Sequence, residues 1–345
     1  MSSAAADGLS TAQYIAQERF RRVCPTNNVS YCDVGVPDSA HVLVLLAGSA
    51  MDCVLSGVLF EDFCRNNGLR MISVDKPGMG KTPACPIAER LASHADAIET
   101  VLTHLKVQPS VLVSISVGFL YSLNLLARKP HLFEGRVPAL FSLTPWISFE
   151  DAPSLSIASW SPNWMVAAVP WFIATFAPPK LLSAFSWSSG VSTAVSSSIG
   201  FGKSEEDAER VGISNSNRDR VFHALNGAVQ NKGMADEYLL CLQRGPPGLW
   251  GFKDYSEILG QIAELYPRTV LRLYMGDKDV LVPRAAQTRF IAFFDPSLST
   301  LLPEVREKFD FAEKTFPGGG HEDVATFARC WEDISRYVHD HVSSQ

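Results

Sequence analysis

The sequence has few charged residues and no long run of either sign. Charged residues make up 19% of the 345-residue chain, and 30 basic against 36 acidic side chains give a formal charge of −6. A surface that follows nucleic-acid phosphates needs clustered lysine and arginine, so we exclude nucleic acid as the main partner. Apolar residues make up 46% of the chain, which is enough for a sizeable core and excludes a disordered protein.

Cysteine is sparse and irregularly spaced. The seven cysteines are an odd number, and no two of them form a C-x-x-C pair. A disulfide framework or a zinc ribbon needs closer and more regular spacing, so we expect reduced thiols and a cytoplasmic protein. The first fifteen residues also lack the basic start and apolar stretch of a secretory signal.

Long hydrophobic runs are also missing. The uninterrupted apolar stretch from Trp164 to Ala177 is shorter than the roughly 20 residues that a membrane-spanning helix needs, and it contains Pro170. We therefore predict no transmembrane segment. Peripheral attachment to a membrane through this stretch is kept as an alternative.

Short apolar runs alternate with helical patterns in two blocks of the chain. The runs are mostly continuous, which is typical of strands buried on both faces of a parallel sheet. A repeated strand–helix–strand order indicates a mostly parallel sheet in an α/β fold, with helices on both faces. The predicted strands are 41–48, 70–75, 110–115, 139–143, 269–275 and 309–316, with helices at 92–105, 117–127, 285–294 and 322–342 and a leading hairpin at 20–23 and 29–34.

Residues 148–264 do not follow this order. Between residues 151 and 200 the only charged side chains are Asp151 and Lys180, and tryptophan and phenylalanine are frequent. We predict that 1–147 and 265–345 form the core and that 148–264 is a mostly helical insertion, or lid, over one end of the sheet. Some of its aromatic side chains are expected to line a pocket for an apolar substrate. The candidates are Trp164, Trp171, Phe172, Phe176 and Trp250.

The segment Ser114–Gly118 carries the first candidate for chemistry. It reads S-I-S-V-G and lies between a predicted buried strand and the helix that follows it. A serine on a sharp strand-to-helix turn projects its hydroxyl above the sheet, and small neighbours fit the cramped turn. Ser116 is therefore a candidate nucleophile, with a helix-capping serine as the structural alternative.

A serine nucleophile needs a base that accepts its proton and a third group that orients the base. His321 follows a run of three glycines after the last predicted strand, and such a loop can bring an imidazole over a neighbouring strand end. Asp279 follows the predicted strand that ends at residue 275. Asp277 and Glu150 are alternatives for the orienting acid, and a loop or capping role is the alternative for His321.

The chain order Ser116, Asp279, His321 resembles that of the α/β-hydrolase family, in which the acid and the histidine follow the nucleophile in this sequence. Residues 276–279 are similar to the family's G-x-x-D, and residues 75–80 are similar to its D-x-P-G-x-G. The resemblance covers about 40–145 and 265–342. It implies an α/β-hydrolase fold with a helical lid and a Ser-His-Asp triad.

The sequence departs from the family pattern at two places. Ser114 stands where the family's G-x-S-x-G has its first glycine, and Ala47-Gly48 stands where many members have His-Gly. The resemblance implies an oxyanion hole formed by the backbone N–H groups of Ser49 and Val117. Because both donors belong to the main chain, the missing histidine does not remove them.

Together these features predict a serine hydrolase that cleaves an ester, lactone or thioester of an apolar small molecule. Serine rather than aspartate at position 116 argues against epoxide hydrolase and haloalkane dehalogenase chemistry. No metal or organic cofactor is implied. Two alternatives stay open: a non-hydrolytic enzyme of the same fold, catalysing acyl transfer, C–C bond cleavage or cyclisation, and a small-molecule receptor. The sequence does not determine the oligomeric state.

Overall fold

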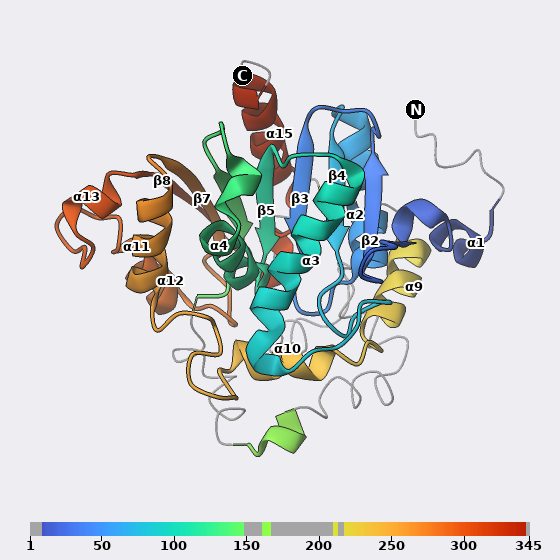
Figure 1. Ribbon diagram of the computed structural model, residues 1–345, viewed down its shortest axis with the longest axis horizontal. Helices are drawn as coiled ribbons and strands as arrows, with labels where there is room; N and C mark the ends of the chain where they lie inside the picture. The colour runs from blue at the N-terminus through green and yellow to red at the C-terminus, as the bar shows by residue number, and fades with distance from the viewer. Residues whose placement is uncertain (1–8, 148–160, 167–209, 213–216, 343–345) are drawn as a thin grey trace.

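The computed structural model describes residues 9–147, 161–166, 210–212 and 217–342 (Figure 1). Eight strands of these residues form one sheet in the order β1-β2-β4-β3-β5-β6-β7-β8. β2 pairs antiparallel with β1 and β4, and all other neighbouring strands are parallel. The strands are β1 (Arg22–Val23), β2 (Ser30–Gly35), β3 (Val42–Leu46), β4 (Arg70–Val74), β5 (Val111–Ile115), β6 (Ala139–Leu143), β7 (Thr269–Gly276) and β8 (Phe309–Phe316).

The central strands are buried on both faces of the sheet. In β3, Val44 and Leu46 belong to one hydrophobic cluster, whereas Leu43 and Leu45 belong to another. Successive side chains of a strand point to opposite faces, so the two clusters are the cores above and below the sheet. The predicted mostly parallel sheet, with continuous apolar strands and a leading antiparallel hairpin, is confirmed.

Helices of the described residues cover both faces, as predicted; α3 and α4 lie on the near side in Figure 1. One core includes side chains of α3 (Arg90–Leu105), α4 (Gly118–Arg128), α11 (Tyr255–Leu265) and α12 (Arg284–Ile291). The other includes side chains of α2 (Cys53–Asn66), α9 (Arg218–Ala228) and α15 (Ala328–Val342). The remaining helices are α1 (Thr11–Ile15), η2 (Glu18–Phe20), η3 (Ile87–Glu89), η4 (Pro130–Phe133), α10 (Met234–Cys241), α13 (Pro303–Arg306) and α14 (His321–Val324).

The prediction of one helix over 322–342 is wrong. The structure has α14 and α15 separated by a turn, in which Phe327 forms an isolated antiparallel bridge with Arg210. The N–H of Val211 also donates to the carbonyl of Thr326 at 2.8 Å. These long-range backbone bonds hold residues 326–327 outside the helical conformation, and nothing in the local sequence pattern indicates them.

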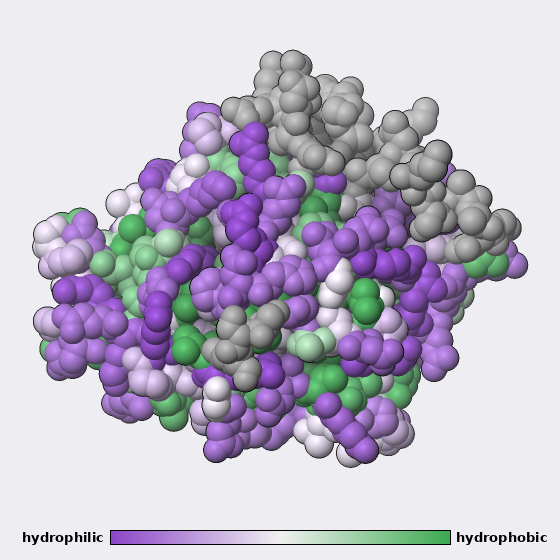
Figure 2. Space-filling model, turned by 90° about the horizontal axis from the view of Figure 1, so that it is seen from above, coloured by the Kyte–Doolittle hydropathy of each residue, from purple (hydrophilic) through white to green (hydrophobic). Residues whose placement is uncertain are grey.

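Of the predicted insertion 148–264, the described residues include α9, α10 and most of α11. In Figure 1, α10 lies across the lower end of the sheet. The division into a core and a lid stays a prediction. Hydrophilic residues predominate among the coloured residues of the face in Figure 2, where hydrophobic residues form small separate groups. Within the described ranges, no helix combines the length and the apolar character that crossing a bilayer requires.

Candidate active site

Three of the predicted site residues meet at one edge of the sheet. Ser116 follows β5, Asp279 follows β7, and His321 is the first residue of α14, after β8. Because β5, β6, β7 and β8 are parallel neighbours, their carboxyl ends lie at the same edge. The sheet therefore brings together side chains that are up to 205 positions apart in the chain.

The three side chains form a continuous chain of hydrogen bonds. His321 Nε2 lies 2.8 Å from the Oγ of Ser116, and His321 Nδ1 lies 2.7 Å from Oδ2 of Asp279. His321 is 2% exposed and Asp279 is 5% exposed, so water competes little for either bond. Ser116 is half-buried. This arrangement can transfer a proton from a serine to an oriented imidazole.

Ser116 lies on a tight turn between β5 and α4. Its φ angle is +52°, in the left-handed region that residues with a side chain seldom occupy. Its N–H donates to the carbonyl of Leu143 at 3.0 Å, and its carbonyl accepts the N–H of Trp146 at 3.0 Å. These bonds to the end of β6 and the loop after it hold the unfavourable conformation, which projects the hydroxyl away from the sheet.

The turn also requires small residues around the serine. A Cβ added to Gly118 would lie 1.9 Å from the carbonyl oxygen of Leu46, at the end of β3. A Cβ at Gly48, in the loop after β3, would be 3.7 Å from the Cβ of Ser116. The start of α4 and the loop after β3 are therefore packed closely beside the candidate nucleophile.

The acid that contacts His321 in the structure is Asp279. Its Oδ1 accepts the N–H groups of Leu281 and Val282 at 2.9 and 2.8 Å, which leaves Oδ2 directed to the imidazole. Asp277, the first alternative, is exposed, and its Oδ1 accepts the N–H of Gly318 at 2.7 Å. Glu150, the second alternative, lies outside the described residues.

The surroundings of His321 favour its charged form. Burial disfavours the imidazolium, but the charge and hydrogen bond of Asp279, together with the charge of Glu322, outweigh burial and raise the pKa of His321 above its ordinary value. An imidazole with a raised pKa is a stronger base. It is also protonated up to a higher pH, which matters for the pH dependence discussed below.

The predicted oxyanion donors lie on the two segments next to Ser116. Val117 is the N-cap residue of α4 and is fully buried, and Ser49 lies in the turn Gly48–Met51 after β3. Among the described residues, no backbone carbonyl accepts a hydrogen bond from the N–H of either residue. Both amides are thus free of main-chain partners in the part of the chain that the structure describes.

A buried ionic cluster that the sequence analysis did not identify lies beside this turn. Lys76 Nζ donates to Oε2 of Glu237 at 2.8 Å, and Arg90 Nε donates to Oε1 of the same carboxylate at 2.6 Å. The hydroxyl of Tyr121 also donates to Oε1 of Glu237. These four side chains are at most 2% exposed. No sequence pattern separates Glu237, which follows Asp236 in the short helix Met234–Cys241, from an ordinary surface glutamate.

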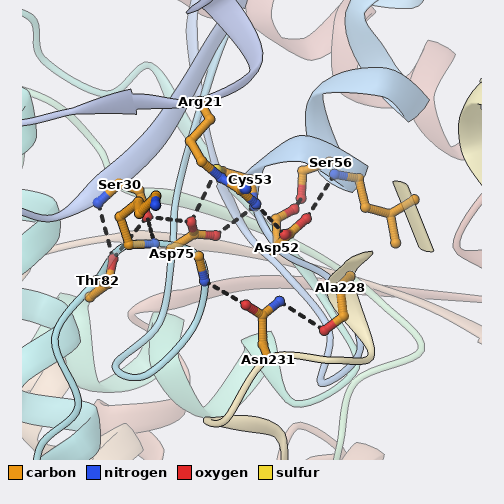
Figure 3. A network of polar contacts seen from close by, with 12 residues as sticks. Arg21, Ser30, Asp52, Cys53, Ser56, Asp75, Thr82, Ala228 and Asn231 are labelled. Atoms are coloured by element: carbon orange, nitrogen blue, oxygen red, sulfur yellow. Dashed lines mark hydrogen bonds and ion pairs between the residues drawn. The ribbon is translucent and has the colours of Figure 1, made fainter. Parts of the chain in front are cut away.

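The D-x-P-G-x-G segment has a structural role at its first residue. Figure 3 shows the carboxylate of Asp75 between Ser30 of β2 and Cys53 of α2. Ser30 Oγ donates to Asp75 Oδ2 at 2.5 Å, and the N–H of Cys53 donates to Oδ1 at 2.6 Å. The N–H of Gly80 donates to the side chain of Asn231, which precedes α10, at 2.8 Å. Asp75 thus links the end of β4 to a second strand and to a helix start.

The predicted pocket residues are only partly covered by the structure. Trp171, Phe172 and Phe176 lie outside the described residues. Trp250 is a core residue rather than an evident pocket wall, because it packs against Phe252 and its indole N–H donates to a backbone carbonyl at 2.8 Å. Trp164 is 71% exposed, so in the structure its ring faces solvent. Among the described residues, no group of three or more histidine, cysteine, aspartate or glutamate side chains is arranged to hold a metal ion.

The chain was compared with protein-family models, with characterised proteins and with solved structures. No protein-family model matches the sequence. Human protein ABHD14A is 38% identical over 120 residues, which are 34% of this chain and 41% of that protein, so the chain spans less than half of this relative.

Solved structures match most of the chain at low sequence identity. A carboxylesterase from the thaumarchaeon Nitrososphaera gargenis covers 94% of this chain and 100% of its own, with a TM-score of 0.56 and 14% identity. The 2-hydroxy-6-oxo-6-phenylhexa-2,4-dienoate hydrolase of a Rhodococcus species covers 94% and 98%, with a TM-score of 0.57 and 13% identity. A haloalkane dehalogenase variant from Bradyrhizobium elkanii covers 94% and 97%, with a TM-score of 0.55 and 15% identity. These likenesses show a shared fold, on which different chemistries occur.

Proposed function

Because the chain has the α/β-hydrolase fold, we propose that it is a serine hydrolase that cleaves an ester, lactone or thioester bond of an apolar small molecule. The observation that carries this proposal is the hydrogen-bond chain from Ser116 through His321 to Asp279, with distances of 2.8 and 2.7 Å. The positive φ of Ser116 supports it as well, because backbone strain is often found at functional sites.

In the proposed mechanism, Ser116 attacks the carbonyl carbon while His321 Nε2 accepts its proton. Asp279 accepts the Nδ1–H of the imidazole, which selects the tautomer with a free Nε2 and stabilises the imidazolium that forms. The imidazolium then protonates the leaving group, so that an acyl group remains on Ser116. Water, deprotonated by the same imidazole, releases the acid and restores the serine.

The negative charge that develops on the carbonyl oxygen needs donors beside Ser116. The N–H groups of Ser49 and Val117 are proposed for this role. Two observations support the assignment. Neither amide has a main-chain partner among the described residues, and a Cβ added at Gly48 would lie 3.7 Å from the Cβ of Ser116, so the loop that carries Ser49 runs close to the serine. Losing one such donor costs roughly 10²–10³-fold in turnover in well-studied hydrolases.

The apolar substrate class follows from the composition of residues 151–200, which contain two charged and many aromatic side chains. A series of p-nitrophenyl esters of increasing chain length tests it. Increasing kcat/KM with chain length supports an apolar acyl site, and a preference for the acetate with no gain on lengthening contradicts it. Adding an alcohol acceptor and measuring the ester formed distinguishes hydrolysis from acyl transfer.

A fluorophosphonate probe tests the mechanism directly, because it reacts with activated serines and leaves a stable adduct. We expect the intact protein to be labelled at Ser116, as mapped by peptide mass spectrometry, and Ser116→Ala to be unlabelled. Ser114→Ala is the matched control from β5, the strand just before the turn, since the Ser114 hydroxyl donates to Ser142 Oγ at 2.7 Å rather than to the imidazole. A label on another residue, or no label, contradicts the proposal.

A further inference from the structure

Lys76 makes an unusual set of contacts for a buried lysine. Its Nζ donates to the carbonyl of Gly48 at 2.7 Å, to the carbonyl of Ala47 at 3.3 Å and to Glu237 at 2.8 Å. An ammonium group has three N–H donors, so all three are used. Two of them are bonded to the loop after β3, the segment that carries one of the proposed oxyanion donors.

The contact with Gly48 acts on the amide of Ser49. The carbonyl of Gly48 and the N–H of Ser49 belong to one planar, trans peptide unit and point in opposite directions. The Gly48 oxygen also accepts the N–H of Met51 at 3.2 Å, and the cation bound to it at 2.7 Å is a second, charged contact that helps to fix the direction of the N–H at the other end. The cation also polarises the peptide, because linked hydrogen bonds in a buried environment strengthen one another.

We propose that Lys76 is a positioning residue that holds the Gly48–Ser49 peptide so that the Ser49 N–H is presented to the oxyanion formed at Ser116. This inference rests on the proposed serine hydrolase function. The place of the peptide agrees with it, since a Cβ added at Gly48 would lie 3.7 Å from the Cβ of Ser116, so the loop after β3 runs close to the serine.

Glu237 holds Lys76 in this position. It is a fully buried residue of α10, and its two oxygens are bound separately, Oε2 to Lys76 and Oε1 to Arg90. The N–H of Gly233, just before α10, also donates to the carbonyl of Gly78 at 2.9 Å. The loop after β3, which carries Ser49, is therefore connected through Lys76 to α10, a helix of the predicted lid.

The test uses Lys76→Met, which keeps the length of the side chain and removes its charge and donors. The readout is the rate of fluorophosphonate labelling at Ser116, a reaction that also develops charge on an oxygen beside the serine. We expect this rate to fall by about 10- to 100-fold, less than the roughly 10²–10³-fold loss for a missing donor, because the Ser49 N–H is still present. The kcat for a p-nitrophenyl ester is expected to fall by the same factor, with a smaller change in KM.

Ile98→Ala is the matched control for stability. Ile98 is a buried residue of α3 whose truncation lowers stability, and its apolar side chain makes none of the hydrogen bonds of Lys76. At a temperature where circular dichroism shows each variant folded, Ile98→Ala is expected to be labelled at the wild-type rate. An equal loss of labelling in Ile98→Ala, or a wild-type rate in Lys76→Met, overturns the inference.

Glu237→Gln keeps the test decisive where Lys76→Met does not fold. Burial already lowers the pKa of Lys76 against the opposing charge of Glu237, so removing that charge lowers it further. Labelling of Glu237→Gln should therefore fall, relative to wild type, as the pH rises; a ratio that does not change with pH overturns the inference. If the wild-type protein itself is not labelled at Ser116, the proposed function fails and this inference fails with it. If wild type is labelled and both variants equal it, only this inference fails.

Discussion

At the level of single residues, two neighbouring aspartates of one loop have different surroundings. Asp279 is buried and in contact with His321, whereas Asp277 is exposed and accepts the N–H of Gly318. Only a buried carboxylate on Nδ1 can select the tautomer of the imidazole and stabilise its charge. The resemblance of residues 276–279 to G-x-x-D favoured Asp279, but it left Asp277, two positions earlier, as an alternative. The turn that directs Asp279 inward is held by the amides of Leu281 and Val282.

If the proposed function holds, Asp279→Asn is expected to lower the kcat for a p-nitrophenyl ester by about 10⁴-fold, the loss seen when the triad acid of a well-studied serine protease becomes an amide. The remaining activity should reach its half-maximum at lower pH than in wild type, because Asp279 raises the pKa of His321 and its neutral replacement does not. A pH–rate profile measures both effects. The matched variant Asp277→Asn should keep wild-type kcat and the wild-type midpoint. A large loss in Asp277→Asn, with little in Asp279→Asn, would reverse the assignment.

At the level of secondary-structure elements, the position of Ser116 depends on how closely α4 approaches β3. The helix begins at Gly118, where a Cβ would overlap the carbonyl oxygen of Leu46 at 1.9 Å. This oxygen is part of the backbone of a central strand and has little freedom to move. The glycine is therefore required by packing, independently of any role in chemistry.

Gly118→Ala is expected to lower the free energy of unfolding by about 1–3 kcal/mol, the usual cost of overpacking a tightly packed interior. It should also reduce the labelling of Ser116, since the turn must shift. Gly260→Ala, in α11, is the matched control, because a Cβ there meets no atom within 4 Å. That variant should be stabilised by about 0.5–1 kcal/mol, as glycine is unfavourable inside a helix. Urea unfolding measures both changes, and equal effects at the two positions would contradict the packing argument.

The elements that the sequence predicts well are those with a local signal. Continuous apolar runs identified the parallel strands, and the order of Ser116, Asp279 and His321 along the chain identified the side chains that meet at the carboxyl edge. α2 was not identified, because its residues 53–61 are buried on all sides and show no single apolar stripe. The cluster of Lys76, Arg90 and Glu237 was also missed, since its members are far apart in sequence and each resembles a surface charge.

At the level of the whole molecule, buried charges make the stability depend on pH in opposing ways. Burial and the charge of Asp52 raise the pKa of Asp75 to about 6, so this group gains a proton in the folded state and stabilises the fold as the pH falls through that value. Burial and the nearby charges of Lys76 and Arg90 lower the pKa of His94 to about 3, although Glu237 opposes them. His94 therefore stays neutral in the folded protein while the unfolded chain binds a proton below about pH 6.5, and stability is lost as the pH falls.

His94→Gln removes the pH-dependent contribution of His94 to stability. The difference between wild type and this variant therefore separates that contribution from those of other groups such as Asp75. His94 packs edge-on against Tyr121, its Nδ1 has no hydrogen-bond partner, and it lies near two cations, which together with burial outweigh the charge of Glu237 and disfavour its protonation in the fold. Relative to His94→Gln, wild type should lose up to about 1.4 kcal/mol of unfolding free energy per pH unit between about pH 6.5 and pH 4.5. Glu237, whose pKa Lys76 and Arg90 lower to about 2 against the opposing effect of burial, acts mainly below this window.

Urea titrations at several pH values measure the difference, with His104→Gln, an exposed histidine of the same helix, as the matched control. Parallel pH curves for wild type and His94→Gln would show that the imidazole takes up its proton in the folded protein as readily as in the unfolded chain.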